Sequence, residues 1–417
     1  MKFVIIGSGP AGIIAAETIR KKLPEAAIQM LTKDPVPALS PVMLTYWAGG
    51  KFEKTDISFR PENWAQQFNV DLLRNTPVIG ISPEDRKVLP ENRPAISFDR
   101  LLVACGAKSI SLPIPGSDLM GVGFFRNFYD TDTFIADPLK AERVVIIGGG
   151  FIGMKLACHL RERGFAVVIL ERENCLASRT IDDTASQIIT AKLEKHGIQV
   201  KTGVFIKNII GRNGRVLAVA LEDGTQIETQ QVVLAAGVRP NIEIVEKTDI
   251  RMNRGIVVNE HMQTSFREIY AAGDVAVTKD SITGEWLNNA IWPAATQQGN
   301  VAGSNMAGEA KQYRHNFPIN ALELFGMRIM SAGYPLETPG DDVTVDKNLE
   351  KGEYIKRVIR QKRLCGFIMI GKIDQAGRDL QMMKKQTMLG VDVQKRETAS
   401  DSRRPKGFGY AHGRIFR

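Results

Sequence analysis

Residues 3–12 read FVIIGSGPAG, in which a run of apolar residues leads into glycines at positions 7, 9 and 12. The stretch that follows, AGIIAAETIRKK, is typical of a helix. In such a unit the first glycine permits a tight turn, the second lets the backbone approach a pyrophosphate, and the third lets helix and strand pack closely. Phosphates then lie at the helix N-terminus, where free N–H groups and the dipole favour negative charge. We therefore predict a dinucleotide at Gly7, Gly9, Pro10, Ala11 and Gly12; the competing interpretation is a turn that binds nothing.

A second glycine motif, RVVIIGGGFIG, places Gly148, Gly150 and Gly153 before the helical stretch MKLACHLRERG. The next strand, AVVILE, ends at Glu171, about 20 residues after the first glycine, where an acid holds the adenosine ribose. A carboxylate there would repel a 2′-phosphate, so we favour NAD over NADP. The adjacent Arg172 weakens that preference.

In the first unit the corresponding strand is AIQMLTKD, residues 27–34. Thr32 occupies the position equivalent to Glu171, and Asp34 follows two residues later. Either Asp34 reaches the ribose or Thr32 binds it more weakly.

Three further buried strands end in short turns. Residues 98–116 contain Ala104, Cys105 and Gly106, residues 269–277 (IYAAGDVAV) contain Gly273 and Asp274, and QVVLAAGVRPN (231–241) echoes the first of them with Gly237. Each could be any buried strand with a turn, but in this order and spacing the set is specific.

The composition is that of an ordinary globular chain, with 417 residues, 43% hydrophobic and 24% charged. We expect roughly two to four domains. The apolar start is interpreted as strand, turn and helix, because its glycines would be wasted in a signal peptide. No apolar run approaches the ~20 residues that span a membrane, so we expect a cytoplasmic protein.

Cysteine spacing argues against several kinds of site. The four cysteines lie far apart, without a CxxC pair, at Cys105, Cys158, Cys175 and Cys365. This pattern excludes a sequence-local redox disulfide and a secreted disulfide framework, and it predicts no metal site. Cys158, in an apolar helical pattern, is expected to be a core residue.

The net charge of +9 is uneven. Residues 395–417 hold seven Lys and Arg against two Asp and Glu. The segment is either a solvated tail or an arm that docks on an acidic partner. Nucleic-acid binding is the weaker interpretation of the charge, because no basic groove interleaved with aromatic residues is evident.

Together these motifs resemble the two-dinucleotide flavoproteins of the pyridine-nucleotide disulfide oxidoreductase family, over roughly residues 1–390. The resemblance implies an α/β fold of two dinucleotide-binding, Rossmann-like domains, one inserted in the other, plus a small α+β C-terminal domain. The implied boundaries are 1–115 and 241–317 for the two parts of an FAD-binding domain, 116–240 for an NAD-binding domain, 318–395 for a C-terminal interface domain, and 396–417 for a basic tail.

The resemblance also implies the cofactor contacts. Asp274 would bond the FAD ribitol or phosphate, and Pro293 would begin a helix whose positive end faces the N1–C2 edge of the flavin. The implied FAD contacts are Gly7, Gly9, Pro10, Ala11, Gly12, Thr32, Asp34, Pro41, Val78, Ala104, Cys105, Gly106, Gly273, Asp274, Pro293 and Thr296. The implied NAD contacts are Gly148, Gly150, Phe151, Ile152, Gly153, Glu171 and Gly237.

The segment LSPVML, residues 39–44, is apolar and broken by Pro41, which predicts a poor helix and a poor central strand. In the disulfide and peroxide branches of the family a cysteine lies beside the flavin near this point. Here the segment resembles the cysteine-free branch of nitrite-reductase-type and rubredoxin-reductase-type flavoproteins. We therefore expect it to form the wall beside the isoalloxazine ring, with the flavin as the last redox centre of the chain.

The resemblance implies an NADH:acceptor oxidoreductase whose partner is a separate Fe–S or rubredoxin-like protein. Such a flavoprotein serves as a subunit of larger complexes, phenylglyoxylate dehydrogenase among them. The alternatives are a free-standing NADH oxidase or diaphorase and, less favoured, a flavin-dependent nucleic-acid-binding protein. Residues 353–371 read as two strands around the turn RQKR and resemble the C-terminal domain of this branch.

One departure from the family concerns the nicotinamide–flavin contact. Relatives carry a Glu two residues after the third glycine, paired with a Lys that follows the wall segment. Here the two positions are Lys155 and Tyr46. We predict that they form an exchanged catalytic pair, with Lys155 in the first turn of its helix; alternatively, Lys155 points elsewhere.

Overall fold

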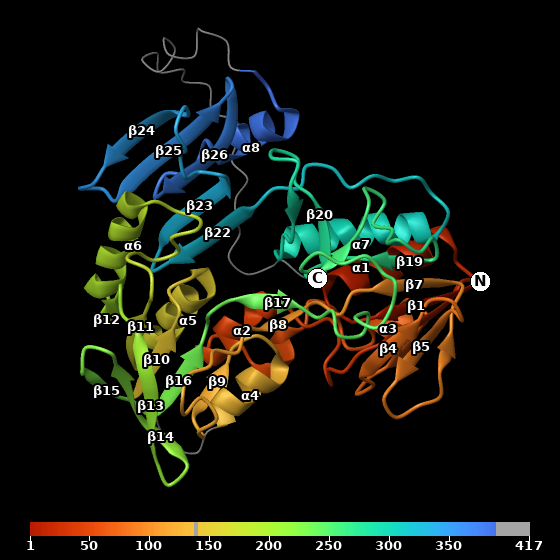
Figure 1. Ribbon diagram of the computed structural model, residues 1–417, viewed down its shortest axis with the longest axis horizontal. Coiled ribbons are helices and arrows are strands. Elements are labelled where there is room, and N and C mark those ends of the chain that lie inside the picture. The colour runs from red at the N-terminus through yellow and green to blue at the C-terminus, as the bar shows by residue number, and fades with distance from the viewer. Residues whose placement is uncertain (137–140, 389–417) are drawn as a thin grey trace.

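The computed structural model describes residues 1–136 and 141–388 (Figure 1). The basic tail, 396–417, lies outside these residues. Two parallel sheets with helices form the two nucleotide units, and an antiparallel sheet forms the C-terminal domain. This arrangement confirms the predicted fold class.

The first unit is built on a parallel sheet whose central strand is buried on both faces. Phe3, Val4 and Ile5 are fully buried, as expected for a parallel sheet covered on both sides. In sheet order its strands are β19 (Ile269–Ala271), β7 (Arg100–Val103), β1 (Lys2–Ile6), β2 (Ala27–Leu31) and β3 (Val70–Leu73). Because β19 pairs with β7, the chain leaves this sheet and returns to it after the second unit.

The returning segment is anchored by two helices in close contact, α1 (Pro10–Lys22) and α7 (Trp292–Met306). A Cβ at Gly299 would lie 2.2 Å from the Ala11 carbonyl oxygen, and one at Gly303 would lie 2.7 Å from that of Ala15. Only glycine permits this approach, so α7 covers the first unit at backbone contact.

The second unit repeats the same architecture. Its parallel strands, in sheet order, are β12 (Ile198–Lys201), β11 (Ala166–Leu170), β10 (Arg143–Ile147), β16 (Gln231–Leu234) and β9 (Val122–Phe124). Its helices are α4 (Phe128–Ala136), α5 (Phe151–Glu162) and α6 (Asp183–Lys195). Glu171 follows β11 directly, as the sequence predicts.

Smaller elements connect the units. The minor sheets are β4 (Val78–Ser82), β5 (Lys87–Pro90) and β6 (Ile96–Ser97); β13 (Ile206–Arg212), β14 (Arg215–Leu221) and β15 (Gln226–Glu228); β8 (Ala107–Ser109) and β17 (Val238–Pro240); and β18 (Ile256–Val257), β20 (Ala276–Lys279) and β21 (Trp286–Leu287). A 3-10 turn spans Lys54–Ile57 and the short helix α3 spans Trp64–Gln67.

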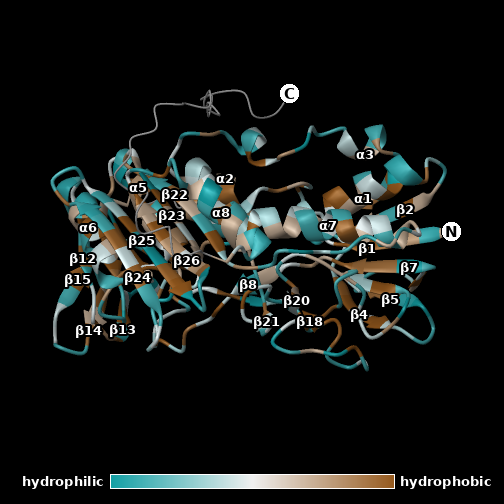
Figure 2. Cartoon of the chain, turned by 90° about the horizontal axis from the view of Figure 1, so that it is seen from above, coloured by the Kyte–Doolittle hydropathy of each residue, from teal (hydrophilic) through white to brown (hydrophobic). Residues whose placement is uncertain are grey.

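The C-terminal domain is a five-stranded antiparallel sheet with the helix α8 (Ala376–Lys385) on one face. Its strands, in sheet order, are β22 (Ile319–Leu324), β23 (Met327–Gly333), β26 (Arg363–Ile370), β25 (Glu353–Arg360) and β24 (Asp342–Asn348). The predicted two strands around RQKR are β25 and β26, and Gln361 and Lys362 turn between them at φ +51° and +59°. In Figure 2 apolar residues line many of the strands in these sheets.

The wall segment is a helix, which corrects the expectation for residues 39–44. Helix α2 runs Pro41–Ala48. Pro41 occupies the first helical position, where its missing N–H breaks no hydrogen bond and its fixed φ suits the helix. Pro293 is the second residue of α7 and not the first, and its missing N–H is again harmless.

Within residues 1–136 and 141–388, every helix is too short or too polar to cross a bilayer.

The contact between α1 and α7 predicts a large difference between two glycine substitutions. Gly299→Ala should lower stability by about 1–3 kcal/mol, since its methyl group would overlap Ala11 backbone. Gly377→Ala, in α8 with open space around it, should be neutral or stabilise by up to about 1 kcal/mol. Thermal unfolding of both variants measures the difference; equal midpoints would contradict the close packing.

Candidate functional site

The first glycine turn leaves room for a phosphate. Gly7 has φ +107°, and a Cβ there would lie 2.2 Å from the Ala104 carbonyl oxygen. A Cβ at Gly12 would lie 2.0 Å from the Gly7 carbonyl oxygen, whereas Gly9 has nothing within 4 Å. Helix α1 begins here with neither a side-chain cap nor an acidic residue in its first turn. The free N–H groups of its first turn thus lie next to the open space at Gly9, an arrangement that fits a pyrophosphate.

The predicted FAD residues from distant segments meet at this turn. A Cβ at Gly273 would lie 3.1 Å from that of Ala11, and the Gly273 N–H donates to Gln298 Oε1 at 2.8 Å. Asn288 Nδ2 holds the Asp274 carbonyl at 2.9 Å. The ends of β1, β7 and β19 thus converge on the N-terminus of α1.

At the end of β2 the structure distinguishes the two ribose candidates. Thr32 is buried, and its Oγ1 accepts from Ser8 Oγ at 3.0 Å and from the Asp34 N–H at 3.2 Å. Asp34 Oδ1 is buried without a hydrogen-bond partner in the described chain. The pKa of Asp34 lies above its usual value. Burial is the largest cause, the nearby charge of Lys33 opposes it, and the charge of Asp130 adds to it. Asp34 is therefore the acceptor that still needs a donor.

The sequence analysis missed Arg126, which lies beside the predicted site residue Asp274. Its guanidinium forms an ion pair with the Asp274 carboxylate, and both side chains are mostly buried. Its backbone N–H donates to Asp130 Oδ2 at 2.9 Å, just before α4. No spacing rule links Arg126 to a glycine motif, so the sequence held no signal for it beyond a basic residue between a strand and a helix.

The remaining predicted FAD residues are more dispersed. Val78 begins β4, half-buried against the first core, two residues after Thr76, whose N–H donates to the Thr32 carbonyl at 2.8 Å. Pro41 opens α2. Thr296 Oγ1, at the start of the second turn of α7, donates at 3.0 Å to the carbonyl of Pro293 in the first turn. That turn carries no acidic residue, so its positive end is unopposed by its own side chains.

Cys105 is structural and not a nucleophile. Burial raises its pKa to about 12. Its Sγ donates to the Asn241 carbonyl at 3.1 Å, and Asn241 Nδ2 donates to the Cys105 carbonyl at 2.8 Å. These bonds fasten the turn at Gly106 to the segment GVRPN. Burial also raises the pKa of Cys158 to about 12 and raises those of Cys175 and Cys365, and Cys158 is buried as predicted.

The second glycine turn has the same construction. Gly148 has φ +120°, a Cβ at Gly153 would lie 2.2 Å from the Gly148 carbonyl oxygen, and Gly150 has nothing within 4 Å. Phe151 and Ile152 begin α5, and the Ile152 side chain is 46% exposed. Gly237 follows β16 at φ +101°. This turn also fits a pyrophosphate.

Glu171 is aimed at this turn. Its Oε2 accepts from the Gly149 N–H at 2.7 Å, and its Oε1 accepts from the Glu173 N–H at 2.9 Å. The carboxylate therefore lies at the rim of the turn, where ribose hydroxyls could donate to it.

The structure brings Lys155 and Tyr46 together. Lys155 Nζ lies 4.6 Å from the centroid of the Tyr46 ring, which is cation–π distance. Lys155 is the fifth residue of α5, in its second turn, which corrects the expectation of the first turn. The centroids of the Tyr46 and His159 rings lie 4.2 Å apart. Burial lowers the pKa of His159 to about 4. Tyr46 thus joins α2 to α5.

The geometry defines a two-nucleotide α/β oxidoreductase fold, and comparison with known proteins identifies its family. Residues 1–299 match the family model described as pyridine nucleotide-disulphide oxidoreductase, and residues 318–387 match the rubredoxin NAD+ reductase C-terminal domain. The chain belongs to the pyridine nucleotide-disulphide oxidoreductase family. Proteins of this family contain FAD and depend on NAD(H).

The chain covers different shares of the proteins to which it is similar. Nitrite reductase [NAD(P)H] of Bacillus subtilis (strain 168) is 30% identical over 387 residues, which cover 92% of this chain and 47% of that protein. The chain thus spans about half of that relative. NADH oxidase of Methanocaldococcus jannaschii is 36% identical, covering 75% of this chain and 72% of that protein. NADH-dependent phenylglyoxylate dehydrogenase subunit epsilon of Aromatoleum evansii is 27% identical, covering 93% and 92%.

Solved structures show the same fold. The covalent putidaredoxin reductase–putidaredoxin complex contains a chain with TM-score 0.86 and 22% identity, covering 93% of this chain and 94% of that one. NADH:rubredoxin oxidoreductase from Clostridium acetobutylicum has TM-score 0.79 and 25% identity, covering 93% and 96%.

The raised thiol pKa values predict inert core cysteines. With iodoacetamide at pH 8, Cys105 and Cys158 should stay unlabelled in the folded protein, because the thiolate is the reactive form. Cys175, which is only partly buried, should be labelled first. Peptide mass spectrometry before and after unfolding measures this; rapid labelling of Cys105 in the folded state would contradict a structural role.

Proposed function

We propose that the chain is an FAD-dependent oxidoreductase that moves electrons between NAD(H) and a separate Fe–S or rubredoxin-like redox protein, as a subunit of a larger complex. One observation carries the proposal: the chain has two open glycine turns, and the cysteine beside the first is a buried thiol with a pKa of about 12. Because the thiol beside this turn is not reactive, electrons from the flavin would leave to another protein. Bound FAD supplies the chemistry, since it takes up a hydride and can release single electrons.

The first turn would hold FAD. The N–H groups at the start of α1 would bind the pyrophosphate beside Gly9, and the unpaired Asp34 Oδ1 would accept from the ribose. Arg126 adds a cation to the same cradle. On this proposal its ion pair with Asp274 aligns both side chains, and the guanidinium stabilises the phosphate charge.

The second turn would hold NAD(H), with Glu171 accepting from the adenosine ribose. Lys155 and Tyr46 would lie between the two cofactors, where the ammonium stabilises negative charge on the reduced flavin. The structural support for this pair is their contact across α2 and α5. We also propose the domain boundaries given in the sequence analysis, and we propose that the protein is cytoplasmic.

Relatives support an external acceptor. Similar proteins include the rubredoxin-NAD(+) reductase of Pseudomonas putida and the rhodocoxin reductase of Rhodococcus erythropolis. The C-terminal domain of this chain matches the domain model of the former kind.

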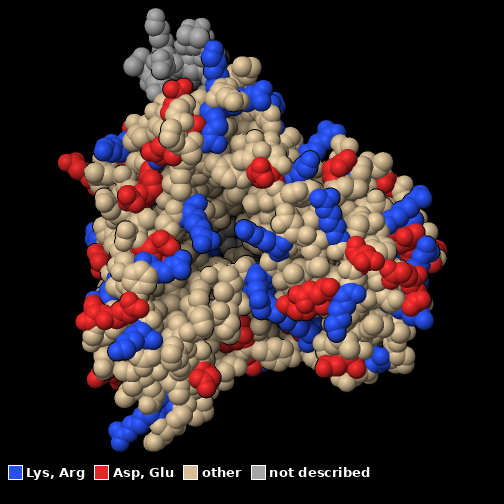
Figure 3. Space-filling view, viewed as in Figure 1, with Lys and Arg blue, Asp and Glu red and all other residues tan. Residues whose placement is uncertain are grey.

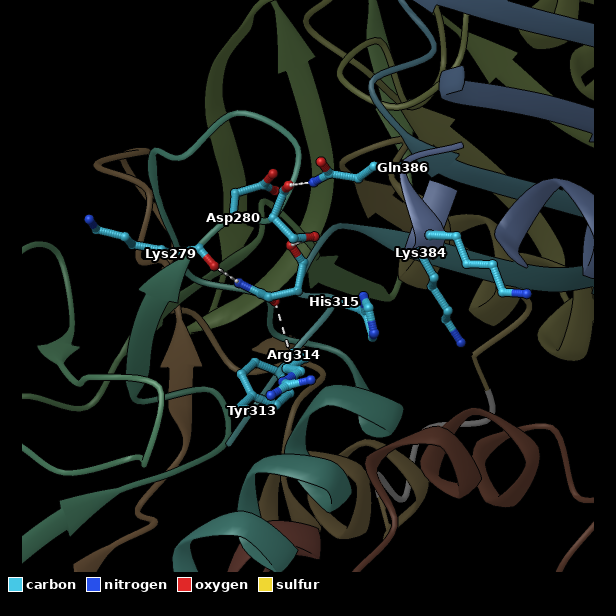
Figure 4. A pocket seen from close by; sticks show the side chains of 10 residues that line it. Lys279, Asp280, Tyr313, Arg314, His315, Lys384 and Gln386 are labelled. Carbon is cyan, nitrogen blue, oxygen red and sulfur yellow. Dashed lines mark hydrogen bonds between the residues drawn. The ribbon is translucent and has the colours of Figure 1, made fainter. Parts of the chain in front are cut away.

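A basic pocket suggests where an acceptor would dock. Lys and Arg side chains surround a hollow in the face drawn in Figure 3. A separate pocket of about 420 Å³ lies between the FAD unit and α8; in Figure 4, Lys384 and Gln386 lie on one side, and Arg314 and His315 on the other. Among the described residues, Lys279, Arg314, Lys384 and Lys385 in this pocket form no ion pair with a carboxylate.

The pocket shares a wall with the start of α7. Asn316, which lines it, accepts at its Oδ1 from Asn289 Nδ2 at 3.1 Å. Asn289 lies two residues before Ile291, the N-cap of α7, and that helix is predicted to face the flavin. An acidic acceptor in the pocket would therefore lie behind the flavin-facing helix end.

An NADH oxidase remains the second candidate, favoured by the 36% identity to the oxidase of M. jannaschii. Oxygen consumption separates the two: an oxidase consumes oxygen at the rate at which NADH reduces the flavin. The nucleic-acid alternative has gained no support.

The proposal predicts cofactor preference. In anaerobic stopped-flow mixing, NADH should bleach the flavin absorption at least about tenfold faster than NADPH, since a phosphate beside Glu171 would meet a like charge costing several kcal/mol. Glu171→Gln should narrow this ratio. Glu194→Gln, on the exposed side of α6, is the matched control and should not. If wild type shows equal rates with both nucleotides, Glu171 has no such role.

The pocket predicts a docking defect. The double variant Lys384→Glu/Lys385→Glu should slow electron transfer to an acidic ferredoxin by on the order of tenfold at low salt, because steering acts on the association rate. Transfer to a small neutral dye should not change. Lys347→Glu, on the exposed strand β24, is the control. A variant as fast as wild type would place docking elsewhere.

A further inference from the structure

The C-terminal domain holds a loop of the second nucleotide unit. In Figure 1 its sheet lies over α6, and the two share one hydrophobic core, in which Tyr354 and Ile368 of the sheet join Ile181 and Ile189. The loop between β11 and α6 runs from Glu171 to Asp182. Its first residue faces the glycine turn, and its last residue faces the C-terminal sheet.

Lys356 is the centre of the contact at the far end of this loop. It lies on β25 with its side chain 4% exposed, and its Nζ contacts Asp182 Oδ2 at 2.8 Å and Glu337 Oε2 at 2.5 Å. Tyr354, on the same face of β25, donates its O–H to the same Asp182 oxygen at 2.6 Å. From β23, Ser331 Oγ donates to the Thr180 carbonyl at 2.8 Å.

Asp182 links this cluster to the second unit. Its other oxygen, Oδ1, caps α6 by accepting from the Ala185 N–H at 3.0 Å. Burial raises the pKa of Asp182, but the hydrogen bonds from Lys356, Tyr354 and Ala185 outweigh it, and the pKa lies below its usual value. The carboxylate is therefore charged at neutral pH and bound on both sides.

The near end of the loop is bound to the glycine turn. The Ala177 N–H donates to the Gly149 carbonyl at 3.1 Å, and Glu171 accepts from the Gly149 N–H at 2.7 Å. A Cβ at Gly149 would lie 2.5 Å from Leu176 Cδ2. Thr180 donates its O–H to the Ala177 carbonyl at 3.0 Å. Lys356 and Ser331 thus hold Asp182 and Thr180, and Thr180 is bonded to Ala177, which is bonded to the turn.

We infer that Lys356 is a positioning residue for the nicotinamide nucleotide: with Tyr354 and Ser331 it presses the β11–α6 loop against the second glycine turn, so that NAD(H) affinity depends on the C-terminal domain. This inference rests on the proposed binding of NAD(H) at that turn. A buried ammonium between two carboxylates suits the role, since removing it leaves the partly buried Asp182 carboxylate without a cation, and the loop must move to hydrate it. The coupling is reciprocal, so bound nucleotide should in turn tighten the sheet.

The test compares two neighbouring residues of β25. Lys356→Met should raise the KM for NADH by on the order of tenfold, within the usual range for coupled sites, while kcat with a dye acceptor and the FAD content stay near wild type. The matched control is Arg357→Met. Arg357 points to the other face and pairs at 2.5 Å with the buried Asp379 inside the C-terminal domain, so its loss weakens the domain without touching the loop.

A second readout separates positioning from mere stability. In wild type and in Arg357→Met, NAD+ should slow hydrogen–deuterium exchange of the amides in β23 and β25; in Lys356→Met this protection should be lost. Tyr354→Phe, which keeps the ring in the core, should raise KM by a few fold and serves if Lys356→Met does not fold.

Two failures remain distinguishable. If NADH does not reduce the flavin of the wild-type protein, the proposed function is wrong. The exchange experiment with NAD+ then still tests whether Lys356 couples the C-terminal sheet to the second glycine turn. If the flavin is reduced but Lys356→Met and Tyr354→Phe match Arg357→Met in KM and in NAD+ protection, the inference about Lys356 is overturned.

Discussion

The structure depends on the backbone contact between the first and third glycines of each nucleotide turn. A single methyl group at Gly12 or Gly153 would lie within 2.2 Å of the carbonyl oxygen of Gly7 or Gly148. This contact sets the helix close against its strand and aims the helix N-terminus at the carboxyl end of the sheet. The ends of the neighbouring strands then meet at that point, so Ala104 and Asp274 lie beside a turn from which they are distant in sequence.

The same kind of contact holds the returning segment in place. Gly299 of α7 touches the backbone of Ala11, next to the first turn, and Gly273 touches the Ala11 side chain. Helix α7 is thereby fixed relative to α1, and its N-terminus has no acidic residue in its first turn. The same steric constraint, a carbonyl oxygen in the place that a Cβ would need, fixes both glycine turns and the position of α7 against α1.

Much of this could be predicted from sequence because it is local. Glycine spacing, buried-strand runs and the acid after β11 each lie within one strand–turn–helix unit, and the turn RQKR lies within one hairpin. The helical wall was mispredicted because a proline reads as a helix breaker until its position in the first turn is known. Arg126 and Lys356 could not be found this way: each acts through a carboxylate more than a hundred residues away in the chain, and charge alone does not reveal such a partner. The choice between Thr32 and Asp34 likewise needed geometry, since only the structure shows which oxygen is already bonded.

The C-terminal domain gains its importance from contacting both units. Toward the first unit, Tyr334 donates its O–H to Asp280 at 2.8 Å, and Gln386 Nε2 donates to the Ser281 carbonyl at 2.5 Å. Toward the second, it shares a hydrophobic core and surrounds Asp182. On the proposed function, the buried Cys105 thiol cannot take electrons from the flavin, so the electrons would leave through a contact at the surface. The C-terminal domain would then contact both ends of that path, because it lines the basic pocket on one side and holds the β11–α6 loop on the other.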